Sequence, residues 1–105
     1  MSYNLHIARE DYKNNPITYE EVVNLVNAHS ELKLRNEMEI KTPVGGIITI
    51  PGKYIFWRKK EFDIWMEYRN GKINSSYVND DNIKKLKEMA HELKAKVLGD
   101  EGEEY

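Results

Sequence analysis

The segment from residue 32 to residue 42 alternates strictly between two kinds of side chain, and no other feature constrains the fold as tightly. One side carries Leu32, Leu34, Asn36, Met38, Ile40 and Thr42, and the other carries Lys33, Arg35, Glu37, Glu39 and Lys41. A period of two with one charged side is typical of a β-strand that packs on a core with one face and meets water with the other. We therefore expect a sheet with one solvated face.

Other apolar or alternating segments predict further strands. They cover residues 3–9, 47–50, 54–57, 62–69 and 73–78, with a last short edge strand over residues 95–98. Pro51-Gly52 is expected to form a turn between two of these strands, because proline and glycine favour the backbone angles of tight turns. Asn70-Gly71 predicts a two-residue hairpin, since a type I′ turn needs positive φ at both central residues.

Two helices are expected as well. Thr18 followed by Glu21 forms a capping box, and Ile17 is placed to pack on Val22 across the first turn of a helix that ends near His29. The second helix starts at a cap on Asn79 or Asp80 and carries an apolar stripe of Ile83, Leu86, Met89, Ala90 and Leu93. Both helices gain their stability from packing this apolar side on a core.

The order of these segments predicts a single α+β domain over residues 1–105. A chain of 105 residues is long enough to bury one self-sufficient core. We expect a mostly antiparallel sheet of five to seven strands with two helices on one face, in the order β-α-β-β-β-β-β-α-(β).

The composition excludes several classes of protein. The chain has no cysteine, which rules out disulfide frameworks, thiolate zinc sites and thiol nucleophiles. Its first residues show no basic region followed by an apolar stretch, and no segment approaches the roughly 18 apolar residues of a membrane span. We therefore expect a cytoplasmic protein that is neither secreted nor inserted in a membrane.

The sequence contains no catalytic or metal-binding motif. The three histidines, at positions 6, 29 and 91, are not spaced as a pair of metal ligands. We therefore expect no metal and no cofactor, and we favour a protein that is not an enzyme. The alternative is an enzyme or a small-ligand carrier with a pocket between sheet and helices, using His6, Glu67 or Arg69 as polar groups.

The last seven residues, 99–105, concentrate negative charge at the end of the chain. They hold Asp100, Glu101, Glu103 and Glu104 without a base, and they end on Tyr105. The whole chain has 16 Lys and Arg against 18 Asp and Glu, so without these four acids its bases outnumber its acids. Four interpretations stay open: a mobile solvated end, an acidic patch that steers a basic partner, a weak divalent-cation site, or an edge strand with Tyr105 folded back as an anchor.

Two tryptophans lie in an aromatic-rich part of the predicted sheet. Trp65 alternates with Phe62, Ile64, Met66 and Tyr68, so we expect it on the opposite face from that set. A tryptophan exposed beside Arg58, Lys59 and Lys60 could stack on single-stranded nucleic acid or anchor a protein interface. Alternatively, helices cover both faces, or Trp65 packs under the first helix. The net charge of −2 and the acidic tail disfavour nucleic acid as the partner.

Several segments match a pattern that spans nearly the whole chain. They are residues 2–9 (Ser-Tyr-Asn-Leu-His-Ile-Ala-Arg), 17–21, Pro51-Gly52 with Trp57 downstream, 68–73, and 95–105 (Ala-Lys-Val-Leu-Gly-Asp-Glu-Gly-Glu-Glu-Tyr). With these segments the chain resembles a family of small bacterial proteins that has no established activity. It departs from that family's pattern at Asn4, where Asp is favoured, and at Val22-Val23, where a Trp is expected. The resemblance implies a bacterial, cytosolic protein and carries over no functional residue.

These observations favour a non-enzymatic protein-binding module, either of the immunity type, which neutralises a toxin, or regulatory. The expected partner is a basic protein. The candidate residues for binding it are Trp57, Trp65, Asp100, Glu101, Glu103, Glu104 and Tyr105. The sequence leaves the oligomeric state and the strand order open.

Overall fold

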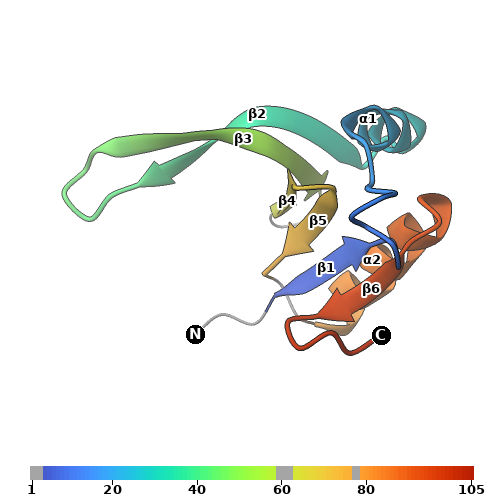
Figure 1. The fold of residues 1–105 in the computed structure, drawn as a ribbon. Coiled ribbons are helices and arrows are strands. Elements are labelled where there is room, and N and C mark those ends of the chain that lie inside the picture. Colours follow the sequence, from blue (N-terminus) through green and yellow to red (C-terminus); the bar gives the residue numbers. More distant parts are fainter. Residues whose placement is uncertain (1–3, 59–62, 77–78) are drawn as a thin grey trace.

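A six-stranded antiparallel sheet organises the computed structural model, which describes residues 4–58, 63–76 and 79–105 (Figure 1). In chain order the elements are β1 (Leu5–Ala8), α1 (Tyr19–Ala28), β2 (Leu32–Lys41), β3 (Ile47–Arg58), β4 (Asp63–Arg69), β5 (Lys72–Ser75), α2 (Asp80–Glu92) and β6 (Lys96–Gly99). The strands lie side by side in the order β2-β3-β4-β5-β1-β6. The predicted α+β domain is confirmed, and β6 is the expected last short strand. Expected strand positions 3, 62, 77 and 78 lie outside the described residues.

Each helix begins where a side chain satisfies its first backbone N–H groups. The hydroxyl of Thr18 accepts the N–H of Glu21 at 3.2 Å, and the carboxylate of Glu21 accepts the N–H of Thr18 at 3.1 Å. The capping box of α1 is therefore present as predicted. At α2 the side chain of Asn79 accepts the N–H of Asn82 at 2.8 Å, so the cap is Asn79 and not Asp80.

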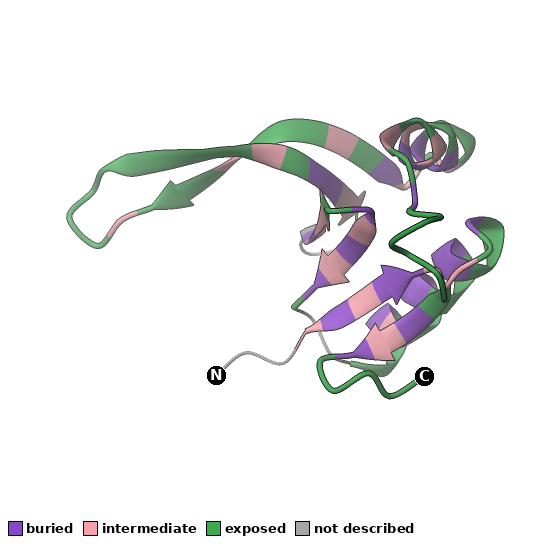
Figure 2. Ribbon diagram, in the orientation of Figure 1, coloured by how far each residue is buried: buried purple, intermediate pink, exposed green. Residues whose placement is uncertain are grey.

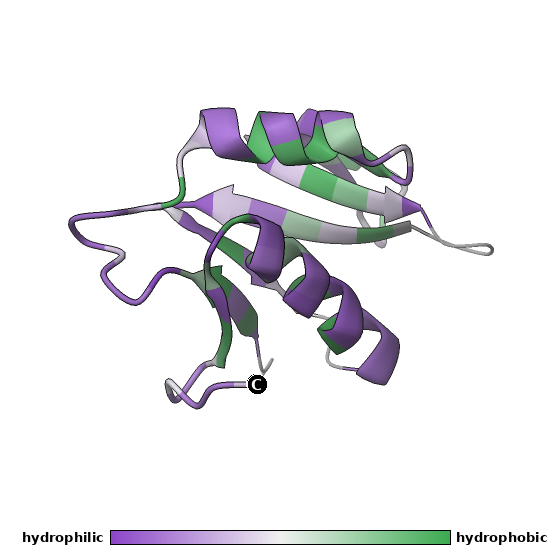
Figure 3. Cartoon of the chain, turned by 90° about the vertical axis from the view of Figure 1, so that its right-hand side faces the viewer, coloured by the Kyte–Doolittle hydropathy of each residue, from purple (hydrophilic) through white to green (hydrophobic). Residues whose placement is uncertain are grey.

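Both helices pack on the same face of the sheet, as expected, and enclose the core with it. Figure 3 shows α1 above the strands and α2 crossing in front of them, with α2 turning a largely hydrophilic surface outward. The buried core joins both helices to all six strands and includes Leu5, Ile7, Val22, Leu25, Leu32, Ile55, Met66, Ile73, Leu86, Met89 and Val97. Figure 2 shows the same division, since the buried residues gather where helices and sheet meet.

The expected turn at Pro51-Gly52 is wrong, because β3 runs through it without a break. The two segments predicted at 47–50 and 54–57 are one strand, Ile47–Arg58, which pairs along its length with β2. The pairing of β3 with β4 begins only at Lys53, so Pro51 lies where β3 has no neighbour on that side among the described residues. A proline without an N–H is tolerated at such an edge position. The register of β2 and β3 shifts between Arg35 and Glu37, opposite this dipeptide.

The outer half of the β2–β3 hairpin leaves the body of the protein as an arm, defined here as residues 37–51 (Figure 1). The alternation of β2 predicted a buried apolar side. The first residues of the strand agree with this prediction, because Leu32 is buried and Leu34 is half-buried. Farther along the strand the apolar side chains continue to alternate but are not covered by the core, and Ile40 is exposed. The strand is longer than the core that the two helices can cover.

Candidate functional site

The face of the sheet opposite the helices carries a row of aromatic and polar side chains. Cross-strand pairing places Phe56 beside Trp65, and Asn74 between Glu67 and His6. Paired residues of antiparallel strands share a face, so these five side chains form one surface, here called the open face. Within the described residues, neither helix lies over it (Figure 1).

Trp57 and Trp65 do not belong to one surface. Trp57 pairs with Ile64 and Leu32 on the helix side of the sheet and packs against the core. Its ring centre lies 5.5 Å from the Nζ of Lys85 on α2. Trp65 lies on the open face, half-buried, so the alternation predicted its side of the sheet correctly. Lys59 and Lys60, expected beside the exposed tryptophan, and Phe62, expected on the face opposite Trp65, lie outside the described residues.

A groove of about 590 Å³ lies between the open face and the outer half of β2. It is lined by Arg35, Glu37, Met38, Glu39, Ile40, Lys41, Phe56 and Trp65. At its inner end the guanidinium of Arg35 lies 5.3 Å from the ring centre of Phe56, a cation–π distance. Tyr54 packs edge to face with Trp65 at 6.0 Å and is buried although no described helix covers it. This part of the open face is therefore a small apolar cluster of its own.

The arm carries aliphatic side chains into solvent. Met38 opposes Ile50 and Ile40 opposes Ile48, so these four side chains share one face of the arm. The exposed fraction of Ile48 is 52%, and that of Val44 at the tip is 93%. Aliphatic side chains exposed together are a usual mark of an interaction surface.

The acidic tail is folded back onto β6 in the structure. The N–H of Tyr105 donates to the carbonyl of Val97 at 2.9 Å, and the N–H of Gly99 donates to the carbonyl of Glu103 at 2.8 Å. Leu98 and Glu104 form an antiparallel bridge. The tail therefore turns back on β6, as the interpretation with an edge strand and an anchoring Tyr105 predicted.

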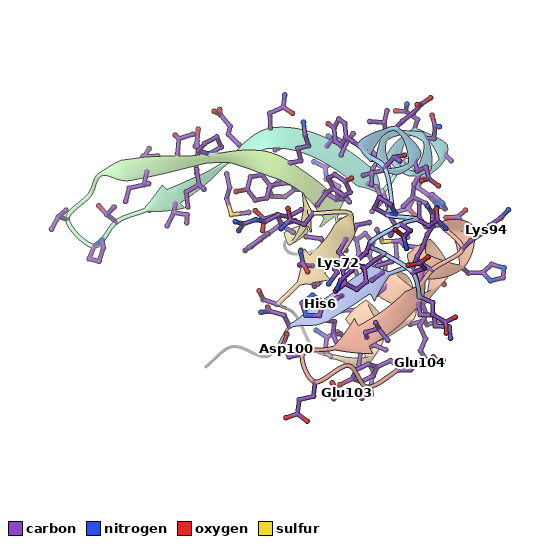
Figure 4. All side chains as sticks on the ribbon, in the orientation of Figure 1. His6, Lys72, Lys94, Asp100, Glu103 and Glu104 are labelled. Atoms are coloured by element: carbon purple, nitrogen blue, oxygen red, sulfur yellow. The ribbon has the colours of Figure 1, made fainter. Side chains whose placement is uncertain are left out.

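Asp100 ties the tail to the other end of the chain. One of its oxygens lies 2.8 Å from Nε2 of His6, and the other accepts the backbone N–H of Asn4 at 2.8 Å. The second ring nitrogen of His6 contacts the side-chain oxygen of Asn74. Figure 4 shows His6 and Asp100 side by side, while Glu103 points away from the body. The N–H of Asn4, and then the hydrogen bond with His6, lower the pKa of the Asp100 carboxyl.

Acidification should release the tail. Since the folded pKa of Asp100 is lowered, its ionised contacts stabilise the tail fully above the ordinary value of 3.8 and are lost as the pH falls through the lower folded value. The protection of the Tyr105 and Gly99 amides, measured by NMR relative to the intrinsic exchange rate at each pH, should therefore fall in that range, which means that exchange accelerates relative to the intrinsic rate. Asp100→Asn should accelerate it already at neutral pH, whereas Glu101→Gln, an exposed acid of the same turn, should not. Unchanged exchange in Asp100→Asn would contradict this role.

The polar groups of the alternative enzyme hypothesis lie away from their expected pocket. The space between helices and sheet is filled by the apolar core of the described residues. His6 and Glu67 lie instead on the open face, two strands or about 10 Å apart, with Asn74 between them. Arg69 is exposed near the end of β4. Within the described residues, no group of three His, Asp or Glu side chains gathers as a metal site would require.

Arg9 was not singled out by the sequence, yet it holds four segments together. Its guanidinium contacts both carboxylate oxygens of Glu21 at the start of α1 and donates to the carbonyl of Leu93 after α2 at 2.9 Å. It also donates to the carbonyl of Pro16 at 3.0 Å. The hydrogen bond from Arg9 is the main reason why the pKa of Glu21 is lowered to about 2. A lone arginine after a strand carries no motif that could have revealed this.

No described helix is long and apolar enough to cross a lipid bilayer. Comparisons of the chain with protein-family models, with curated proteins and with solved structures found no match.

Proposed function

We propose that this protein is a non-enzymatic binding protein that recognises a basic protein partner through its folded acidic tail. The observation that supports this is the pair of contacts that hold Asp100 to His6 and to the backbone of Asn4. Because the segment is tied down at this point, the exposed Glu101 and Glu103 project from an ordered turn. A binding surface that is already ordered loses less conformational entropy when its partner arrives.

The electrostatics of the tail favour a basic partner. Glu104 pairs with Lys96 at 3.1 Å and Asp100 with His6, so the two remaining acids, Glu101 and Glu103, form the outward charge of the turn. Outward charges of one sign raise the rate at which a partner of opposite sign arrives. A protein of this kind would act as an inhibitor or regulator does, by covering a surface of its partner.

Removing these outward charges should slow association. In the variant Glu101→Gln/Glu103→Gln, we expect the association rate constant at low salt to fall about fivefold, with a flatter dependence on ionic strength, because steering is a long-range effect that salt screens. The dissociation rate should change little. Stopped-flow or surface-plasmon kinetics with the captured partner measure both quantities.

A matched control makes the same change in net charge at a different place on the surface. Glu20→Gln/Glu88→Gln removes two exposed acids on α1 and α2 and should leave the rate and its salt dependence unchanged. Equal effects of the two variants would show that only net charge matters.

The partner can be captured with a photo-cross-linking amino acid at position 103, and with a control cross-linker at the exposed position 87 of α2. We expect one basic protein to be cross-linked from position 103 and not from position 87. Capture of the same proteins from both positions, or of none from position 103, would refute the proposed function.

A further inference from the structure

The outer edge of β2 is open although the strand is long. β2 has ten residues and lies at the end of the sheet, with β3 as its only neighbour among the described strands. Long open edges invite pairing with another chain, and soluble proteins normally shorten or cover them. The arm adds to this exposure, because a two-stranded ribbon with an uncovered aliphatic face is only marginally stable in water. Both features indicate that something covers this edge.

The charges of β2 are arranged in two neighbouring blocks of opposite sign. Lys33 and Arg35 form a basic block at the base of the arm, and Glu37 and Glu39 form an acidic block directly after it. All four residues are exposed. If two copies of β2 run antiparallel about a two-fold axis near Asn36, each basic block faces the acidic block of the other copy. Opposite charges facing each other stabilise neighbouring strands, whereas like charges destabilise them.

The groove offers the apolar counterpart of these charges. Its inner end carries Phe56 and Trp65, and its outer part carries Met38 and Ile40 of the arm. With the two-fold axis near Asn36, Met38 of one copy lies opposite Leu34 of the other, and Ile40 lies opposite Leu32, so aliphatic side chains also meet across the contact. In a two-fold contact each favourable interaction occurs twice, because both copies use the same surface patch.

We propose that the open edge of β2 pairs with the β2 strand of a second copy of this chain, so that the protein is a two-fold dimer joined along β2. A foreign strand would need an acidic and a basic block in the matching order, whereas a second copy has them by symmetry. The proposal is independent of the tail, because β2 and β6 lie at opposite edges of the sheet. A dimer formed at β2 leaves both acidic tails at its far ends, where each is accessible to a partner.

The test reverses one charge block at a time in the purified full chain. Wild-type protein should show the mass of a dimer by light scattering and sedimentation, with an affinity that falls as salt is added. Glu37→Lys/Glu39→Lys makes both blocks basic, and Lys33→Glu/Arg35→Glu makes both acidic. Each variant alone should dimerise roughly a hundredfold more weakly, because like charges now face each other at both contacts.

Mixing the two variants is the decisive step. All facing blocks are again of opposite sign, so the mixture should form a heterodimer, which a distinguishing tag on one variant detects. A misfolded variant could not be rescued in this way, and circular dichroism of each variant checks its fold directly. A wild-type protein that is monomeric at every concentration, or a mixture of the two variants that forms no heterodimer, would overturn the proposal. Because no other protein is present, neither result bears on the proposed function of the tail.

Discussion

Gly71→Ala should lower the free energy of unfolding by about 3 kcal/mol. Gly71 is buried and has φ of +76°, which costs an alanine roughly 1 kcal/mol. In addition, an added Cβ would lie 2.5 Å from the Cβ of Pro16, and relieving such a clash in a packed site costs about 1–3 kcal/mol. The chain cannot move aside easily, because the carbonyl of Gly71 accepts the N–H of the buried Ile17 at 3.1 Å. Urea denaturation followed by circular dichroism measures the loss.

Gly45→Ala separates the two causes. Gly45 has φ of +86°, but an added Cβ would meet no atom within 4 Å. This variant should therefore lose only about 1 kcal/mol. Pro16→Gly in the Gly71→Ala background removes the clashing atom and should recover part of the stability. Equal losses at Gly71 and Gly45, or no recovery in the double variant, would show that contact with Pro16 is not the cause.

Arg9→Met should cost about 2–3 kcal/mol. It removes five hydrogen-bond contacts to Glu21, Leu93 and Pro16 and keeps most of the apolar stem. Breaking a fully buried ion pair costs about 3–5 kcal/mol. We expect a smaller loss, because the side chain of Arg9 is 11% exposed but that of Glu21 is 37% exposed. Chemical denaturation of both proteins at neutral pH gives the difference.

Two controls test whether the partners of Arg9 are responsible. Arg69→Met removes an exposed arginine and should change the stability by less than about 0.5 kcal/mol. The pH dependence is the second control. With a folded pKa of about 2, Glu21 stabilises the wild type fully above 4.5, and this contribution is lost as the pH falls from 4.5 towards 2. The variant should lose less stability over that interval, and identical pH profiles would contradict the role of the pair.

Local signals predicted the elements of this fold well. The Thr18 and Glu21 pair predicted the start of α1, because a capping box satisfies backbone N–H groups within four residues. Asn70 and Gly71 predicted the β4–β5 hairpin, and both have the positive φ that the turn requires. In both cases the interactions that decide the structure lie within a few residues of each other.

Pro51-Gly52 shows where such signals fail. The same dipeptide can turn a chain or lie within an edge strand, and its neighbours in sequence do not decide between these outcomes. The decision depends on the pairing with β2 and on the pairing with β4, which begins at Lys53 of β3. An unbroken β3 is what produces the arm, so the arm and its exposed isoleucines could not be recognised before the pairing was known.

The candidate site was predicted in its parts and not in its arrangement. Trp65 was assigned to the correct side of the sheet, but Trp57 lies on the other side, in the core, and the two form no common surface. The acidic tail was recognised from composition, whereas its contact with His6 joins residues 94 positions apart. Neither residue type nor spacing carries information about such a contact.

The sequence by itself determined what depends on short-range interactions: the periods of strands and helices, their caps, the hairpin turn and the charge of the tail. Only the tertiary structure decided which face the helices cover, that β2 extends beyond the core, that Arg9 joins α1 to the end of α2, and that Asp100 meets His6. The physical reason is that these outcomes compare the free energies of whole arrangements of packed elements. A local pattern favours an element but is the same in every arrangement that contains it.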